Sequence, residues 1–293
     1  MDTRSAEYYD DIQERLYTSV LADVMDELGY RRQVMDHQIR PLFPEASVVG
    51  RAATMLAAEV YDVPADPFKL EMELLDSLEP GEVVVCTTQG SLHAAMWGEL
   101  LSTHTQAKGG RGAVMDGLTR DSWGIIDIRF PVFAAGLSPA DSKGRLDVMA
   151  TRVPIECGGV RVEPGDLVVA DYDGCLAVPQ GIEDEVIALA LEKVSGENVV
   201  RDILRAGANI GQVFKEHGIC RAGSHPARSR NGEGQCRNSR FTPSGEQLPW
   251  GPTRKGSAPG TSFSSPAPDR STPRPARSRA RRSRSRRVSR SRT

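Results

Sequence analysis

Arg120 and Asp121 are adjacent polar residues that end the stretch GGRGAVMDGLTRD, residues 109–121. Arginine offers a planar fork of N–H donors to a carboxylate, at roughly 1.5–3 kcal/mol per charge-assisted hydrogen bond. Aspartate offers a hard oxygen to Mg²⁺, an ion that keeps several waters and takes only one or two protein carboxylates. The simpler alternative is a surface ion pair worth about 0–1 kcal/mol, and the two residues taken alone favour it.

The glycines before this pair do not form a dinucleotide-binding fingerprint. Gly110 and Gly112 have the G-x-G spacing, but the third glycine is missing and a helix is predicted where a strand should precede; a Walker A pattern is also absent from the sequence. What remains is a buried strand at 113–115 that runs into a sharp turn at Asp116-Gly117, where Asp116 serves either the turn or a site. Sites in α/β proteins favour the loops at the carboxyl ends of strands, so we expect one here.

Two glutamates occupy contrasting positions on predicted helices. One face of a helix over 92–107 would carry the apolar residues Met96, Trp97, Leu100 and Leu101. Glu99 would lie roughly 130° from the centre of that face, as a solvated carboxylate does. Glu197 would fall within the apolar stripe of a helix over 182–204, provided that the helix continues past Gly196. A carboxylate in such a stripe needs a partner or an interface; the alternative is a helix end that frays or rotates at the glycine.

The remaining candidate ligands have simpler explanations. Asp171 and Asp173 bracket a tyrosine in a predicted hairpin, where they bind a metal or make the turn; the turn is favoured. His93 and His104 would share one face of the 92–107 helix at its core edge. Their separation of eleven residues excludes a local metal clamp, although His93 is near enough to the expected site to be tested.

Helices alternate with strands in the first half of the chain, and hairpins dominate the second. This order predicts an α/β fold, a layered sandwich in which helices cover a mixed central β-sheet. The expected helices lie at 12–28, 68–78, 92–107, 182–204 and 210–217. The expected strands lie at 47–60, 83–86, 113–115, 131–135, 153–155, 160–162, 167–170 and 175–178.

Charge divides the chain of 293 residues into two parts. Residues 221–293 hold 18 basic and 3 acidic residues, a formal charge of +15, whereas residues 1–220 hold 19 basic and 36 acidic residues, a charge of −17. The second part is rich in Ser, Pro and Arg, and its few apolar groups do not offset the entropy of ordering it, so we expect a disordered tail. Such a tail binds RNA, an anionic surface or the acidic first part, or has no selected role. The absence of stacking aromatics argues against nucleic acid.

The cysteines and the apolar segments suggest a protein of the cytoplasm. Five cysteines occur, an odd number without a CxxC pair, as expected of reduced thiols. Two of them, Cys157 and Cys175, have no base at a recognisable spacing and are predicted to be buried. The acidic N-terminus does not resemble a signal peptide, and no run of 18 apolar residues predicts a membrane span.

The order of several segments resembles the RraA-like family, which includes 4-hydroxy-4-methyl-2-oxoglutarate aldolases. The resemblance extends over about residues 16–218 and leaves the tail outside, so one domain is expected over 1–220. Its core is the pattern G-x-V-x-D-G-x-x-R-D. The matching segments are HAAMWGELLSTHTQAKGGRGAVMDGLTRD (93–121), PVFAAG (131–136), CGGVRVEPGDLVVADYDGCLAVP (157–179) and ENVVRDILRAG (197–207).

The resemblance implies a role for each matching residue. Arg120 matches the arginine that binds the pyruvyl carboxylate, and Asp121 matches the aspartate that ligates Mg²⁺, Mn²⁺ or another divalent metal. Glu99 matches an acidic residue that holds metal-bound waters. The implied fold is the swivelling-domain type of the family. The implied reaction is a class II-type aldol cleavage or a decarboxylation of a small 2-oxo acid, such as 4-hydroxy-4-methyl-2-oxoglutarate or oxaloacetate, which releases pyruvate through an enolate.

The backbone around the start of the 99–107 segment is also implied in binding. Gly98 and the N–H groups of Leu100 and Leu101 match the part that contacts the pyruvyl group. The family further implies a homotrimer, or a hexamer of two trimers, in which a glutamate of the C-terminal helix reaches the site of a neighbouring subunit; Glu197 is its best match. Some members of the family instead bind and inhibit a ribonuclease, so a non-catalytic regulator is the alternative expectation.

Overall fold

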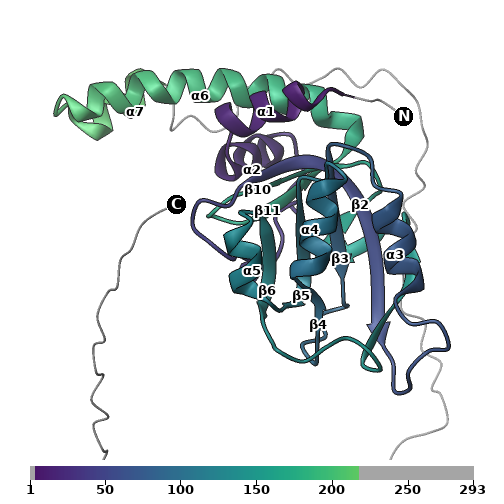
Figure 1. The fold of residues 1–293 in the computed structure, drawn as a ribbon. Helices are drawn as coiled ribbons and strands as arrows, with labels where there is room; N and C mark the ends of the chain where they lie inside the picture. Colours follow the sequence, from purple (N-terminus) through teal and green to yellow (C-terminus); the bar gives the residue numbers. More distant parts are fainter. Residues whose placement is uncertain (1–3, 218–293) are drawn as a thin grey trace, which may run out of the picture. The chain divides into compact units, whose positions relative to one another are not determined.

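A nine-stranded mixed sheet forms the centre of residues 4–217, the part of the chain that the computed structural model describes (Figure 1). Its strand order is β1-β6-β5-β3-β2-β10-β11, with β4 beside β5 and β7 beside β2. The strands are β1 (Arg40–Pro41), β2 (Val48–Glu59), β3 (Glu82–Thr87), β4 (Ala95–Trp97), β5 (Gly112–Thr119), β6 (Val132–Leu137), β7 (Leu146–Thr151), β10 (Leu167–Ala170) and β11 (Cys175–Val178). Helices cover this sheet, as the predicted α/β class requires.

Strands β2 to β6 run parallel to one another, whereas β1, β7 and β10 pair with this group in the antiparallel sense. The side chains of the central strands β3 and β5 are buried on both faces. In β3, Val84 and Cys86 point into one apolar cluster while Val83 and Val85 point into another. This is the alternation that a strand imposes, and it explains why the run VVVC is apolar throughout. Each such aliphatic side chain contributes roughly 1.5–3 kcal/mol of burial free energy.

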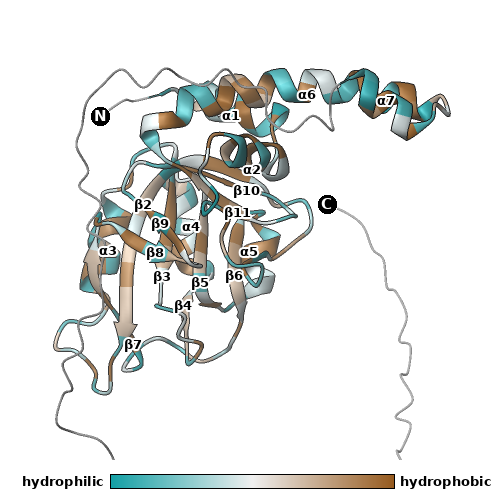
Figure 2. Cartoon of the chain, turned by 180° about the vertical axis from the view of Figure 1, so that it is seen from behind, coloured by the Kyte–Doolittle hydropathy of each residue, from teal (hydrophilic) through white to brown (hydrophobic). Residues whose placement is uncertain are grey.

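Helices α3 (Lys69–Asp76), α4 (Glu99–Ala107) and α5 (Ser122–Asp127) cover one face of the sheet (Figure 1). A two-stranded hairpin, β8 (Ile155–Cys157) and β9 (Val160–Val162), covers the other face, which Figure 2 shows from behind. A third group packs on β10 and β11. Its helices are α1 (Ala6–Arg15), α2 (Thr18–Glu27) and α6 (Glu183–Arg205), with a short 3₁₀ helix before α6 at Gln180–Ile182 and α7 (Ile210–Glu216) after it.

Two predicted helices are wrong in detail. The helix expected over 12–28 is divided into α1 and α2, because Leu16 and Tyr17 have extended backbones with φ of −118° and −139°. The helix expected over 92–107 is β4 followed by α4, with Gly98 between them. The sequence also did not predict α5, β1 or β7. The long helix, by contrast, continues unbroken past Gly196, as one of the two alternatives required.

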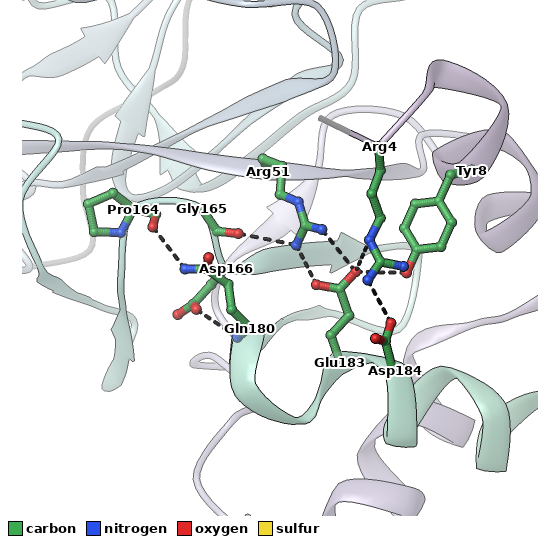
Figure 3. A network of polar contacts seen from close by, with 9 residues as sticks. All are labelled: Arg4, Tyr8, Arg51, Pro164, Gly165, Asp166, Gln180, Glu183 and Asp184. Carbon is green, nitrogen blue, oxygen red and sulfur yellow. Dashed lines mark hydrogen bonds and ion pairs between the residues drawn. The ribbon is translucent and has the colours of Figure 1, made fainter. Parts of the chain in front are cut away.

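A cluster of polar side chains around Glu183 ties the N-terminal helix α1 to the start of α6 (Figure 3). We call it the Glu183 cluster, and its members are Arg4, Tyr8, Arg51 and Glu183. Glu183 is 3% exposed, forms an ion pair with Arg51 and accepts a hydrogen bond of 2.7 Å from the Tyr8 hydroxyl. Arg4 adds a second cation, with its Nε 3.7 Å from Glu183. A buried carboxylate with several partners stabilises the fold only while all of those partners are present. Because the members of the cluster are far apart in the chain, their contacts hold distant segments together.

The predicted tail at 221–293 and the predicted domain boundary at 220 lie outside the described residues. Within residues 4–217, no helix combines the length and the apolar character that crossing a membrane requires.

Candidate active site

Two strand ends and two helix starts meet at Arg120 and Asp121. The pair follows β5 and precedes α5, while Gly98 lies between β4 and α4, and β4 is parallel to β5. Both connections therefore leave the same edge of the sheet, the carboxyl end, where the sequence predicted a site. The sharp turn expected at Asp116-Gly117 is wrong: β5 continues to Thr119, with a shift of register between Met115 and Leu118.

Arg120 is held at both ends of its guanidinium group. Its Nε lies 3.4 Å from Asp121 Oδ2, and its Nη1 lies 3.2 Å from Asp141 Oδ1. Its backbone N–H donates to the carbonyl of Trp97 over 2.9 Å, which joins β4 to the end of β5. The side chain is 36% exposed, so part of the fork of donors still faces solvent. The predicted ion pair between Arg120 and Asp121 exists, but Arg120 also pairs with Asp141.

Sequence reasoning missed Asp141. It lies in the loop between β6 and β7, twenty residues beyond Asp121, and forms an isolated bridge with Ala95. Only this contact between distant segments brings its carboxylate to Arg120. The surrounding letters, SPADSKGR, contain no periodic signal that would have indicated a site.

Close backbone packing at two glycines sets the geometry. A Cβ atom on Gly98 would lie 2.9 Å from Asp121 Oδ2, and one on Gly124 would lie 2.6 Å from Cγ of Glu99. Real Cβ contacts are not that short, so any side chain at either place would displace a carboxylate. Asp121 itself has a left-handed backbone, φ 53°, which aspartate tolerates better than most residues.

The first turn of α4 presents the backbone that the family resemblance singles out. Gly98 is the N-cap, and its carbonyl accepts the first helical bond from Ser102, so the N–H groups of Leu100 and Leu101 precede the helical ladder. The apolar face predicted for a 92–107 helix is wrong, because Met96 and Trp97 belong to a strand. Leu100, expected in the core, has a side chain 77% exposed.

Asp121 and Glu99 line one depression of about 440 Å³, together with Ser122, Trp123 and Gly124. Glu99 Oε1 accepts a hydrogen bond of 2.8 Å from Thr103 Oγ1, which fixes its carboxylate there. Two carboxylates and an open, solvent-facing surface suit Mg²⁺, which retains water. Residues 4–217 do not bring three or more His, Cys, Asp or Glu side chains together as a metal cage, so water or a second chain would complete the coordination.

Glu197 does not reach this depression within one chain. It lies on α6 and accepts a hydrogen bond of 2.6 Å from the hydroxyl of Tyr17, while Arg201 lies 3.9 Å away. Burial and this hydrogen bond raise the pKa of Tyr17. The predicted need for a partner is therefore met by Tyr17, and Figure 1 shows the C-terminal part of α6 extending beyond α1 and α2.

The other candidate ligands have structural roles. Asp171 accepts hydrogen bonds from the N–H and hydroxyl of Thr18, at 2.8 and 2.7 Å, and from the N–H of Asp173, so the favoured turn interpretation is confirmed. His93 is wrongly predicted: it precedes β4, its side chain is 75% exposed and its Nδ1 lies 2.9 Å from Glu59. His104, on α4, is half-buried with its side chain 42% exposed, as expected of a residue at the core edge.

Asp116 is held by hydrogen bonds within the fold, and the cysteines of the described residues are buried. Asp116 accepts hydrogen bonds from the Thr87 hydroxyl at 2.8 Å and from the Thr88 N–H at 2.7 Å. Cys157 and Cys175 are buried, as predicted, and burial raises the pKa of both thiols. Cys220 and Cys236 lie outside the described residues.

Glu71 is a buried acid whose carboxyl group is affected by the charges of Asp147 and Asp141. It lies on α3, is 3% exposed, and its Oε1 has no hydrogen-bond partner among the described residues. Burial raises the pKa of Glu71 to about 8, and the negative charges of Asp147 and Asp141 add to the effect. The carboxyl group is therefore mostly protonated at neutral pH, so Glu71 adds little negative charge to that of Asp141 and Asp147.

Comparisons with known proteins identify the family and support the fold. A family model described as "RraA-like: Aldolase/RraA" matches residues 18–177. The chain is 31% identical, over 60% of its length and 79% of the relative, to a protein of Halalkalibacterium halodurans named "Putative 4-hydroxy-4-methyl-2-oxoglutarate aldolase".

Two solved structures resemble the fold. One, from Pseudomonas syringae pv. tomato, is described as an uncharacterized protein; its TM-score is 0.62 at 28% identity, over 71% of this chain and 97% of that one. The other, RraAS2 of Streptomyces coelicolor, is described as an unusual member of the RNase ES inhibitor RraA protein family. Its TM-score is 0.60 at 28% identity, over 67% of this chain and 98% of that one.

Proposed function

The chain belongs to the RraA-like family, and from that premise we propose that it is a divalent-metal-dependent carbon–carbon lyase that releases pyruvate from a small 2-oxo acid. The proposed substrates are 4-hydroxy-4-methyl-2-oxoglutarate, cleaved in a retro-aldol reaction, and oxaloacetate, which is decarboxylated. The observation that carries the proposal is the convergence of Arg120, Asp121 and Glu99 on one open edge of the sheet.

Asp121 would hold the metal, and Glu99 would hold waters at the same depression. A bound Mg²⁺ or Mn²⁺ supplies Lewis-acid stabilisation of the negative charge that develops on the 2-oxo group, worth several kcal/mol. The donor set supports this choice, because both side chains are hard oxygen ligands and both line the depression.

Arg120 would bind the substrate carboxylate. Asp141 and Asp121 hold Nη1 and Nε, so the side chain is oriented before the substrate arrives and loses little further freedom on binding. The N–H groups of Leu100 and Leu101, at the positive end of α4, would add donors to the pyruvyl group.

In the retro-aldol reaction the C3–C4 bond breaks and its electron pair moves onto the pyruvyl fragment as an enolate. The 4-hydroxyl loses its proton as C4 becomes a carbonyl, and C3 of the enolate takes up a proton to give pyruvate. Glu99, fixed by Thr103, would position the water that exchanges these protons. Arg120 would lower the energy of the enolate through its fixed positive charge.

A homotrimer, or a hexamer of two trimers, would complete the site. We propose that Glu197 contributes to it from a neighbouring subunit, because it lies in the C-terminal half of α6, the helix that extends beyond α1 and α2 (Figure 1); within one chain it accepts a hydrogen bond from Tyr17. Assembly would then require Glu197 to exchange or share that hydrogen bond.

A regulator that binds a ribonuclease is the second candidate. It is favoured by the likeness to RraAS2, whose description names an RNase ES inhibitor family. Such a role would need none of the chemistry at the depression. A protein that releases no pyruvate from either substrate, yet retains a ribonuclease in a binding assay, would have this function.

Release of pyruvate by Arg120→Ala tests the enzyme proposal. We expect kcat/KM on oxaloacetate to fall by about 10²-fold or more, because the variant loses the charge that binds the carboxylate and stabilises the enolate. Arg161→Ala is the matched control: its side chain is 72% exposed, pairs with Glu163 and should leave kcat/KM within twofold. Near-normal kcat/KM in Arg120→Ala would refute the assignment.

A further inference from the structure

Ser102 and Thr119 are polar residues that the fold buries completely next to the candidate active site. Ser102 lies on α4, one turn after Gly98, and Thr119 is the last residue of β5, immediately before Arg120. A buried hydroxyl group costs free energy unless it is hydrogen-bonded, and serine is a weaker helix former than alanine. The stability of α4 alone therefore does not explain a serine at position 102.

The Ser102 hydroxyl joins two groups at the start of its own helix. It accepts a hydrogen bond of 2.8 Å from the indole N–H of Trp97 and donates one of 3.0 Å to the carbonyl of Gly98. Trp97 is itself 1% exposed, so water does not compete for these bonds. Gly98 is the N-cap and has no side chain with which to cap α4. The hydroxyl of Ser102 therefore ties the first turn of α4 to its start from within the core.

The carbonyl of Trp97 ties this first turn to the other connection of the site. It accepts hydrogen bonds from the Thr119 hydroxyl at 3.1 Å and from the backbone N–H of Arg120 at 2.9 Å. Buried hydrogen bonds fix the positions of their partners more strictly than exposed ones, because a buried group left without its partner is not compensated by water. A continuous set of bonds therefore links the start of α4, which carries Glu99, to the end of β5.

A shift at this link would move the side chains that the proposed reaction uses. A Cβ atom on Gly98 would lie 2.9 Å from Asp121 Oδ2 and 3.4 Å from Arg120 Cγ, so the backbone there is in close contact with both side chains. Catalytic groups depend on their relative positions, and a displacement of about 1 Å can cost about 10²-fold in rate.

We propose that Ser102 is a positioning residue, whose hydroxyl holds the first turn of α4 in register with Arg120 and Asp121. This inference rests on the proposed function, because the positioning serves the reaction at that site. Ser102 does not line the depression, so it acts through the backbone of Gly98 and not by touching substrate. The simpler alternative is that Ser102 only satisfies the indole N–H of Trp97, a role that affects stability and leaves the rate unchanged.

Steady-state pyruvate release by the full chain in saturating Mg²⁺, from oxaloacetate and from 4-hydroxy-4-methyl-2-oxoglutarate, tests the inference. Ser102→Ala should lower kcat on both substrates by about tenfold and leave KM within about twofold, because misplaced groups stabilise the enolate less but still bind the substrate. Thr105→Val is the matched control. Thr105 is also buried on α4, but its hydroxyl has no hydrogen-bond partner among the described residues, so kcat and KM should equal those of the wild type.

Trp97→Phe separates positioning from the pairing of the indole. It removes the indole N–H and leaves Ser102 bonded to Gly98, so Ser102→Ala added to it should still lower kcat by about tenfold. No further loss in the double variant would show that Ser102 serves only the indole, and would overturn the inference. A folded Ser102→Ala protein with kcat within twofold of the wild type, whatever its stability in urea, would overturn it too. A wild type without metal-dependent pyruvate release would instead refute the proposed function, and this inference with it.

Discussion

Glu71 makes the stability of the fold depend on pH in a direction unusual for a glutamate. Its pKa is about 8 in the folded chain, against 4.5 for an unperturbed glutamate. Between these values the folded state keeps a proton that the unfolded state has lost, so the free energy of unfolding falls as pH rises. The stabilisation that protonated Glu71 gives the folded state is complete below pH 4.5 and is lost as pH rises through 8.

The magnitude follows from the separation of the two pKa values. At pH 7, about 2.5 units above the pKa of the unfolded glutamate, ionisation of Glu71 favours the unfolded state. The free energy of unfolding is then lower by roughly 3 kcal/mol than at pH 4.5. Glu71→Gln keeps the shape of the protonated acid but does not ionise. The variant should therefore match the wild type near pH 4.5 and exceed its free energy of unfolding by up to about 3 kcal/mol at pH 7.

Urea unfolding of both proteins at pH 5, 6 and 7 measures this difference. Glu73→Gln is the control, because Glu73 is exposed on the same helix and its variant should follow the wild type at every pH. A difference between Glu71→Gln and the wild type that does not grow with pH would contradict the reasoning. It would mean that Glu71 is ionised in the folded protein.

Three further substitutions test the packing of the site and of the fold. Gly98→Ala should lower kcat/KM by about tenfold or more in the pyruvate assay, because the new Cβ would stand 2.9 Å from Asp121 Oδ2. Asp141→Asn should raise KM more than it lowers kcat, since Arg120 loses one of the two carboxylates that orient it. Glu183→Gln should reduce the free energy of unfolding by about 3 kcal/mol, measured with urea, because it breaks the charge pair of the Glu183 cluster. A loss below 0.5 kcal/mol there would show that the cluster does not stabilise the fold.

The sheet was predictable because its strands are apolar on both faces. Runs such as VVVC at 83–86 and LVVA at 167–170 lie where they were expected. The segment at 92–107 misled, because a three-residue strand followed at once by a helix has the same apolar spacing as one longer helix. Likewise, the two N-terminal helices share one apolar face, and only the extended backbone at Leu16 and Tyr17 separates them.

At the candidate site, some residues could be predicted from the local sequence pattern, whereas others are placed only by contacts between distant segments. Arg120 and Asp121 were predictable as polar residues that follow a buried strand. The position of Glu99 was not, because a strand replaces the first part of the helix expected over 92–107 and α4 begins only at Glu99. Gly124, which lacks a Cβ, leaves room for the Glu99 side chain. Asp141 could not be predicted at all, because a loop distant in sequence brings it to Arg120.

The central claim is that Asp121 and Glu99 hold a divalent metal that pyruvate release requires. The most direct measurement is release of pyruvate from oxaloacetate by the full chain after treatment with EDTA, and again after addition of Mg²⁺ or Mn²⁺. The account predicts activity that EDTA abolishes and either metal restores, with Asp121→Asn inactive under both conditions. Pyruvate release that persists in EDTA, or an Asp121→Asn variant as active as the wild type, would contradict it.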